Sequence, residues 1–248
     1  MLKRVLVPVL AALLVAACSP MQHVTKNDDA LHAKNSWDLN YAIMQAADRS
    51  DNIEIGISAG VAELDARPDN DEARILLARF QTKARRPEQA LYTLSQLAAG
   101  HKDSVAARIE RARAYIASGR MDEARADLEA IGTAPAEYDR EKRRLLAVTE
   151  DVAGNHAKAQ ELYRALLAER EDAPVRFNFG RSLITTQNYP QAANVLLPLT
   201  ENARYPQARI LAAGAFLKSG NKTAARNLLE GYLSRMEIDE LLEKGVAK

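Results

Sequence analysis

Aromatic residues are scarce in this chain of 248 residues: they make up 5% of it, with a single Trp. Such a chain has few bulky rings with which to fill one large globular core. Ala, Leu, Arg and Glu are abundant instead, and all four are good helix formers. The composition therefore predicts closely stacked helices with small side chains between them.

Cysteine and an excess of charge are lacking as well. Cys18 is the only cysteine, so no disulfide can form within the chain. The 34 Lys and Arg residues nearly balance the 33 Asp and Glu residues. Proteins that bind nucleic acid need a strongly basic face, so this balance argues against nucleic acid as a partner.

Motifs for catalysis and for metal binding are missing too. The four histidines are scattered and form no HExxH or other metal-binding pattern. The sequence has no Gly-rich phosphate loop and no GxSxG motif around a nucleophilic serine. We therefore expect no enzyme activity, cofactor, metal ion or small-molecule substrate, and we expect protein binding to carry the function.

The N-terminus has the pattern of a secretory signal peptide. Basic Lys3 and Arg4 precede an apolar stretch, Val5–Val15, which is shorter than the roughly 20 residues that span a bilayer. Two alanines then precede Cys18, and small residues before a cysteine resemble the lipobox of bacterial lipoproteins. The resemblance implies a signal peptide over residues 1–17 and lipidation of Cys18. The alternative is an ordinary secretory signal followed by an incidental cysteine.

Residues 18–36 are predicted to comprise the lipidated cysteine and a polar tether. Residues 19–35 are mostly polar and lack a strong apolar period. In the lipoproteins that the lipobox resembles, an Asp after the cysteine tends to retain the protein in the inner membrane, whereas this chain has Ser19. The resemblance thus implies a lipid anchor in the outer membrane, with the protein on its periplasmic face.

The remainder of the chain repeats with a period of about 34 residues. Five alanines mark the repeat at spacings of 34, 35, 33 and 33 residues: Ala90, Ala124, Ala159, Ala192 and Ala225. A small residue lies twelve positions before each alanine. This pattern resembles the tetratricopeptide repeat, a pair of antiparallel helices that stacks on its neighbours. The resemblance implies an all-α, tetratricopeptide-type α-solenoid, a right-handed superhelix of about six helix–turn–helix repeats.

The repeat array is expected over residues 37–236, followed by a capping helix or tail over residues 237–248. Gly56 weakens the first copy because glycine is a poor helix-interior residue, and Glu150 replaces an aromatic residue of the fourth copy. Pro198 falls within the second helix of the fifth copy, where it should shorten or bend the helix or change the curvature of the superhelix. The alternative to a solenoid is a generic helical bundle.

In tetratricopeptide proteins the first helices line a groove that binds a partner. Transferring that pattern to this sequence places eight residues in the groove: Tyr41, Ile75, Arg79, Ile109, Arg113, Phe177, Asn178 and Arg181. Arginine can hydrogen-bond a carboxylate through two nitrogens, so we expect an extended or helical protein segment with acidic and apolar residues. The alternative is that these arginines form ion pairs within the protein.

Two sequence runs carry a more specific resemblance. They are VRFNFGRSL…NYPQAANVLLPL (Val175–Leu199) and ARILAAGAFLKSGNKTAARNLL (Ala208–Leu229), and they resemble the TadD lipoproteins of the Flp/Tad (tight adherence) pilus system. That family implies a pilotin-like role, in which the protein binds the outer-membrane secretin or another pilus assembly component. The alternatives are the type IV pilus pilotins of the PilF/PilW kind and a lipoprotein that activates a peptidoglycan synthase.

Overall fold

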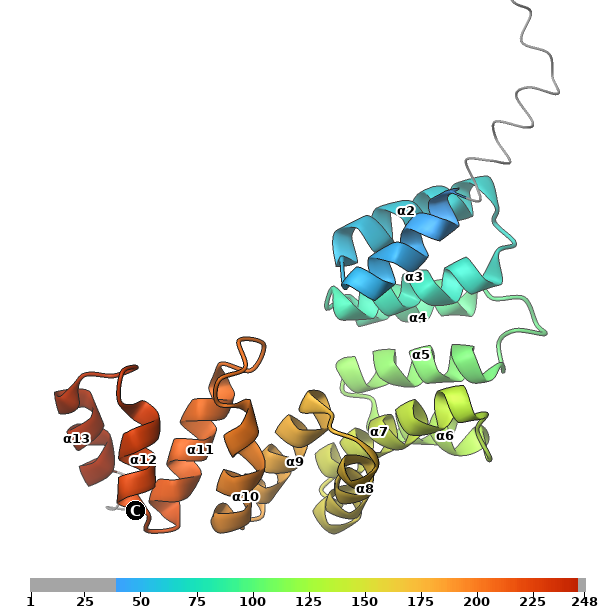
Figure 1. The fold of residues 1–248 in the computed structure, drawn as a ribbon. Helices are drawn as coiled ribbons and strands as arrows, with labels where there is room; N and C mark the ends of the chain where they lie inside the picture. Colours follow the sequence, from blue (N-terminus) through green and yellow to red (C-terminus); the bar gives the residue numbers. More distant parts are fainter. Residues whose placement is uncertain (1–38, 245–248) are drawn as a thin grey trace, which may run out of the picture.

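The computed structural model describes residues 39–244, and within that range the chain is helical and forms no β-sheet (Figure 1). The predicted signal peptide, Cys18 and the polar tether lie outside the described residues. A helix at residues 39–50 is followed by α2 (Ile53–Ala66), α3 (Asp71–Lys83), α4 (Pro87–Ser95), α5 (Val105–Ala117), α6 (Met121–Ala130), α7 (Ala136–Val152), α8 (His156–Glu169), α9 (Ala173–Thr185), α10 (Tyr189–Leu196), the 3-10 turn η1 (Leu197–Leu199), α11 (Gln207–Lys218), α12 (Lys222–Leu229) and α13 (Arg235–Lys244).

These helices pair into six antiparallel hairpins, each joined by a short turn, and α13 follows the last hairpin. Helices of neighbouring hairpins contact one another along the whole array. Figure 1 shows that the stack changes direction near α7 and α8, in the middle of the chain. The predicted solenoid of six helix–turn–helix repeats is therefore confirmed. The described helices do not form the generic bundle that was the alternative.

The turns within the hairpins share one backbone conformation. Gly119, Gly154 and Gly220 follow the first helices of three hairpins with φ of 79°, 85° and 86°, in the left-handed region that glycine adopts at low cost. Arg85 and Gln187 adopt φ of 60° at the equivalent turns, although their side chains disfavour it. Asp51 has φ of 55° at the turn of the first hairpin, so three of the turns adopt the repeated geometry without glycine.

Helix ends follow the local sequence. Asn70 and Ser104 cap α3 and α5, because their side-chain oxygens accept hydrogen bonds from backbone N–H groups three residues later. Pro87 is the first residue of α4, where its missing N–H removes no helical hydrogen bond. Pro198 lies in η1, directly after α10 ends at Leu196. The prediction that Pro198 shortens this helix is therefore confirmed.

Small residues bring the two helices of each hairpin together. The aligned alanines are all at most 1% exposed: Ala90, Ala124, Ala159, Ala192 and Ala225. Gly56 instead brings α2 close to α3 of the next hairpin, since a Cβ there would lie 2.4 Å from the ring of Phe80. The helix α2 runs unbroken through Gly56, so this glycine is a packing requirement rather than a weak point of the first repeat.

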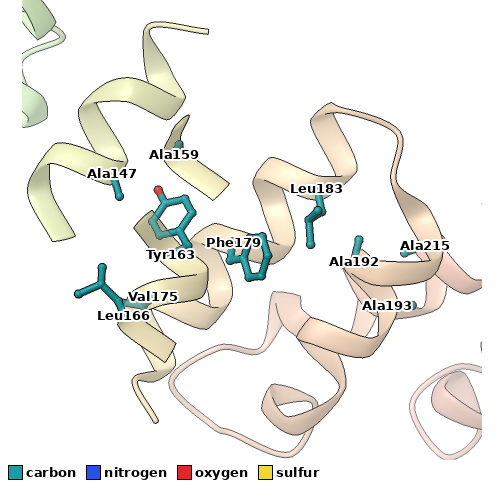
Figure 2. Close-up of a cluster of buried hydrophobic side chains, with 10 residues drawn as sticks. All are labelled: Ala147, Ala159, Tyr163, Leu166, Val175, Phe179, Leu183, Ala192, Ala193 and Ala215. Atoms are coloured by element: carbon teal, nitrogen blue, oxygen red, sulfur yellow. The ribbon is translucent and has the colours of Figure 1, made fainter. Parts of the chain in front are cut away.

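The largest buried cluster joins the fourth, fifth and sixth hairpins (Figure 2). At its centre lie Tyr163 of α8 and Phe179 of α9, whose ring centroids are 6.1 Å apart. A separate cluster closes the C-terminal end, where Ile238 and Leu242 of α13 pack on the last hairpin. This cap begins at Arg235, two residues before the predicted boundary. None of the helices in the described part of the chain is long and apolar enough to cross a membrane.

Candidate functional site along the first helices

A groove of about 700 Å³ runs along the first helices of the first three hairpins and reaches α7 of the fourth. Tyr41 and Gln45 line it from the helix at residues 39–50, Ile75 and Arg79 from α3, and Tyr138 from α7. Three of the predicted groove residues, Tyr41, Ile75 and Arg79, are therefore brought together here. The phenol of Tyr41 donates a hydrogen bond to Glu72 at 3.4 Å, which ties two neighbouring first helices together at the groove.

Ile109 does not line this groove. Its side chain is only 2% exposed and packs with Ala112, Leu128 and Leu145 in a buried cluster. It is buried in the core and cannot contact a partner in this arrangement. In the structure this position of α5 faces the core between α5, α6 and α7, and not the groove as the repeat pattern predicted.

An ion-pair ladder links the first helices of the first four hairpins. Arg79 contacts Asp48 at 2.7 Å and Glu110 at 2.8 Å. Arg113 contacts the second oxygen of Glu110 at 3.0 Å and Glu141 at 2.5 Å. Each arginine thus joins acids from two different hairpins, and networks of this kind stabilise more than isolated surface pairs do. The name ion-pair ladder is used below for Asp48, Arg79, Glu110, Arg113, Glu141 and Arg144.

Partial burial does not neutralise the ladder. Burial alone would lower the pKa of Arg79, but Glu110 and Asp48 outweigh it and raise that pKa above its ordinary value. Burial would raise the pKa of Glu141, but hydrogen bonds and charge from Arg144 and Arg113 lower it below its ordinary value. Both groups are consequently charged at neutral pH, and each charge is compensated within the protein.

The ladder decides between the two interpretations of the groove arginines. Arg79 and Arg113 were candidates for binding an acidic partner, yet both are paired with acids of this chain. A partner carboxylate would have to displace Glu110 or its neighbours to reach them. For these two residues the structure therefore supports the alternative of internal ion pairing, extended from one repeat to the next.

We expect the substitution Glu110→Gln to lower the free energy of unfolding by about 1–1.5 kcal/mol. Glu110 is 1% exposed, and its two oxygens accept one hydrogen bond each from Arg79 and Arg113. An amide offers a single acceptor oxygen and turns an NH₂ group towards the other guanidinium. Urea unfolding followed by circular dichroism measures the change. The matched control is Glu129→Gln on an exposed position, which should stay within about 0.5 kcal/mol of the wild type.

The remaining predicted residues lie in the C-terminal half of the array, away from the groove. Phe177, Asn178 and Arg181 belong to α9, and the ring of Phe177 lies 5.1 Å from that of Tyr205 between centroids. Burial and Asp172 raise the pKa of Tyr205, which the nearby arginines Arg144 and Arg204 partly offset. The predicted site is thus divided between a groove and a separate aromatic pair.

Sequence reasoning missed two kinds of residue. Tyr205 lies in the connector between η1 and α11, outside the repeat positions from which the groove was projected. Asp48 meets Arg79, and Glu141 meets Arg113, only when neighbouring hairpins stack. A local signal was present for Glu110, which precedes Arg113 by three residues on the same helix face.

Glu150, where the repeat pattern has an aromatic residue, is a buried carboxylate. It is 1% exposed and accepts hydrogen bonds from Asn155 and Lys158, both at 2.7 Å. Burial would raise the pKa of Glu150, but these hydrogen bonds and the charges of Lys158 and Arg125 lower it overall. Three partners thus compensate for the lost aromatic residue at this position.

Stability should therefore decline in acid. A carboxylate whose pKa is lower in the folded chain stabilises the fold above the unfolded pKa, and this contribution is lost as pH falls through the folded pKa. Because the pKa values of Glu141 and Glu150 are lowered from 4.5, we expect the free energy of unfolding to fall below about pH 4.5. Urea unfolding between pH 7 and pH 3 measures the decline. It should be shallower in Glu150→Gln, whereas Glu129→Gln should follow the wild type.

Asp151, His156 and Ser182 are the residue types of a hydrolase triad, but their hydrogen bonds do not follow the order that a triad requires. Asp151 accepts a hydrogen bond from the hydroxyl of Ser182 at 2.5 Å and lies 2.8 Å from Nδ1 of His156. In a triad the serine bonds the imidazole, and the imidazole bonds the acid. Here both groups converge on the acid, an arrangement that joins α7, α8 and α9. Within residues 39–244 no group of His, Cys, Asp and Glu side chains is placed to hold a metal ion.

The fold and its groove define a helical-repeat scaffold that mediates protein interactions. Profiles of the tetratricopeptide repeat match residues 82–147 and 177–238. The chain is accordingly an all-α tetratricopeptide-repeat solenoid.

Solved structures support the same fold. Pseudomonas aeruginosa PilF is 16% identical with a TM-score of 0.62, and the match covers 86% of this chain and 99% of PilF. A tetratricopeptide repeat protein from Parabacteroides merdae is 17% identical with a TM-score of 0.61, and the match covers 89% of this chain and 86% of that protein. At such identity the likeness concerns the fold alone. No curated protein sequence matches the chain.

Proposed function

We propose that the protein is a non-catalytic assembly factor, a lipoprotein of the outer membrane that uses its solenoid to bind a component of a Flp/Tad pilus or secretin machine. The observation that carries the proposal is the extent of the match to PilF, which spans nearly all of both chains. The two proteins thus correspond as whole repeat arrays and not as one shared motif. The resemblance of Val175–Leu199 and Ala208–Leu229 to TadD lipoproteins also supports a role in pilus assembly.

The anchor in this proposal is Cys18. Each acyl methylene buried in a membrane contributes about 0.8 kcal/mol, and two or more chains are needed for stable attachment. A cysteine that follows a short apolar stretch is well suited to that modification. Because it is the only cysteine, it cannot form a disulfide within the chain. The polar residues that follow would keep the solenoid close to the periplasmic face of the membrane.

The anchor is tested by Cys18→Ala. Labelled palmitate should enter the wild-type protein and be absent from the variant, because the thiol is the acceptor. The variant should also leave the membrane fraction. Ser19→Asp is the second variant, and it should stay lipidated but move to the inner membrane. Equal labelling of wild type and Cys18→Ala would refute the lipoprotein assignment.

The assembly role is tested by deleting the gene. Secretin multimers in the outer membrane should decrease and surface fibres should be lost, while secretin monomers remain. The wild-type gene supplied in trans should restore both. Normal multimers and fibres in the deletion strain would overturn the role in pilus assembly without affecting the fold or the anchor.

A further inference from the structure

Two cations at the C-terminal half of the array lack the internal partners that the ladder provides. Arg181 of α9 and Arg204 of the connector before α11 are exposed. Neither forms an ion pair with an acidic side chain of residues 39–244. Asp172, whose charge acts on Tyr205, is already paired with Arg140 at 3.1 Å. The positive charge of these two guanidinium groups is therefore available to a ligand.

Apolar surface lies beside this charge. The rings of Phe177 and Tyr205 pack against each other, and Phe177 precedes Arg181 by one helical turn. Ile210, at the repeat position equivalent to Phe177, is 52% exposed. Next along α11, a Cβ added at Gly214 would meet no atom within 4 Å, so the space above this helix is open.

We propose that the cationic–aromatic patch (Phe177, Arg181, Arg204, Tyr205 and Ile210) binds a segment of a partner protein in which a carboxylate lies beside apolar side chains. The carboxylate pairs with Arg181 or Arg204, and the apolar side chains pack on the rings and on Ile210. Aromatic residues and arginine are the residue types that dominate binding energy at protein interfaces. The inference rests on the proposed function. It places the contact with the partner in the C-terminal half of the array, whereas the sequence pattern had predicted a contact at Arg79 and Arg113.

Charge and shape favour a protein segment over a lipid surface. Membrane surfaces are bound through clusters of four to eight basic residues, whereas this patch has two free cations. Two cations suit one or two carboxylates, and the exposed isoleucine and ring pair suit a few apolar side chains. The ladder shows the same pairing chemistry within the chain, since each of its guanidinium groups is bound by Asp or Glu.

The test is a selection from a displayed library of random twelve-residue peptides on the purified protein. Selected peptides should be enriched in Asp or Glu next to Leu, Ile or Phe. The strongest peptide is then synthesised, together with a version whose acids are replaced by their amides. Fluorescence anisotropy should show affinity lower by about tenfold or more for the amide version, for Arg181→Glu and for Phe177→Ala. The matched control is Arg86→Glu, an exposed arginine in the turn before α4 and outside the groove, which should bind as the wild type does.

Several results would overturn the patch. They are peptides without enriched acids, an affinity unchanged by Arg181→Glu, or a loss caused equally by Arg86→Glu. Binding of phosphatidylglycerol vesicles that Arg181→Glu abolishes, without peptide selection, would replace the protein ligand by a lipid. In cells, full rescue of secretin multimers by the Arg181→Glu gene would overturn the patch alone. A deletion strain with normal multimers would instead overturn the assembly role and leave the peptide result standing.

Discussion

Replacing Phe179 with alanine is expected to lower the free energy of unfolding by about 3–5 kcal/mol. Phe179 is 3% exposed and lies between Tyr163 of the preceding hairpin and Leu183 of its own helix (Figure 2). The guanidinium of Arg164 also lies 5.6 Å from the centroid of its ring. Truncation leaves a cavity at the junction of two hairpins, where a solenoid depends on the contact between neighbours.

The effect should be local as well as large. Hydrogen exchange should quicken in α8, α9 and α10 and stay unchanged in α3 and α5, because repeat arrays open in nearest-neighbour units. Phe177→Ala is a control two residues away on the same helix. That ring is half-buried and paired with Tyr205, so its loss should cost about 1 kcal/mol. Equal destabilisation by both variants would show that the central cluster does not hold the two hairpins together.

Gly180→Ala should lower the free energy of unfolding by about 1–3 kcal/mol, although alanine is the better helix former. A Cβ at Gly180 would lie 2.4 Å from Cγ of Leu196, a fully buried side chain of the facing helix. The two helices of the fifth hairpin must then move apart or Leu196 must leave its rotamer. Urea unfolding midpoints measure the change.

Gly214→Ala is the matched control for Gly180→Ala. Gly214 is also a helix-interior glycine, but no atom lies within 4 Å of the position that its Cβ would occupy. Helix propensity should therefore dominate and raise stability by up to about 1 kcal/mol. In a cycle with Leu196→Ala, the penalty of Gly180→Ala should largely vanish. A gain in stability from Gly180→Ala would contradict the close packing of α9 on α10.

Most of the fold could be predicted because its signals are local. The spacing of five alanines located the five hairpins that contain them, and Pro198 marked a helix end by its own chemistry. Gly56 was misjudged for the opposite reason. Its value depends on the ring of Phe80, which comes from the next hairpin.

The candidate site was harder to predict than the fold. Tyr41, Ile75 and Arg79 line one groove in the structure, because the repeat position determines which face of a first helix they occupy. Their chemistry was not evident, since the acids that neutralise Arg79 come from two other hairpins. The repeat pattern predicts which face of a helix a residue occupies. The packing of neighbouring hairpins determines which charged side chain that residue then meets.

The ladder also bears on how the chain acquires its structure. Arg79 is 31 residues from Asp48 and 31 residues from Glu110, and the helices in extensive contact belong to the same or to adjacent hairpins. Contacts of such short range favour rapid folding, since little chain must be ordered before each contact forms. The array can thus fold one hairpin at a time from its N-terminus, each new hairpin docking its charges on the one before, while the rest of the chain is still emerging from a ribosome.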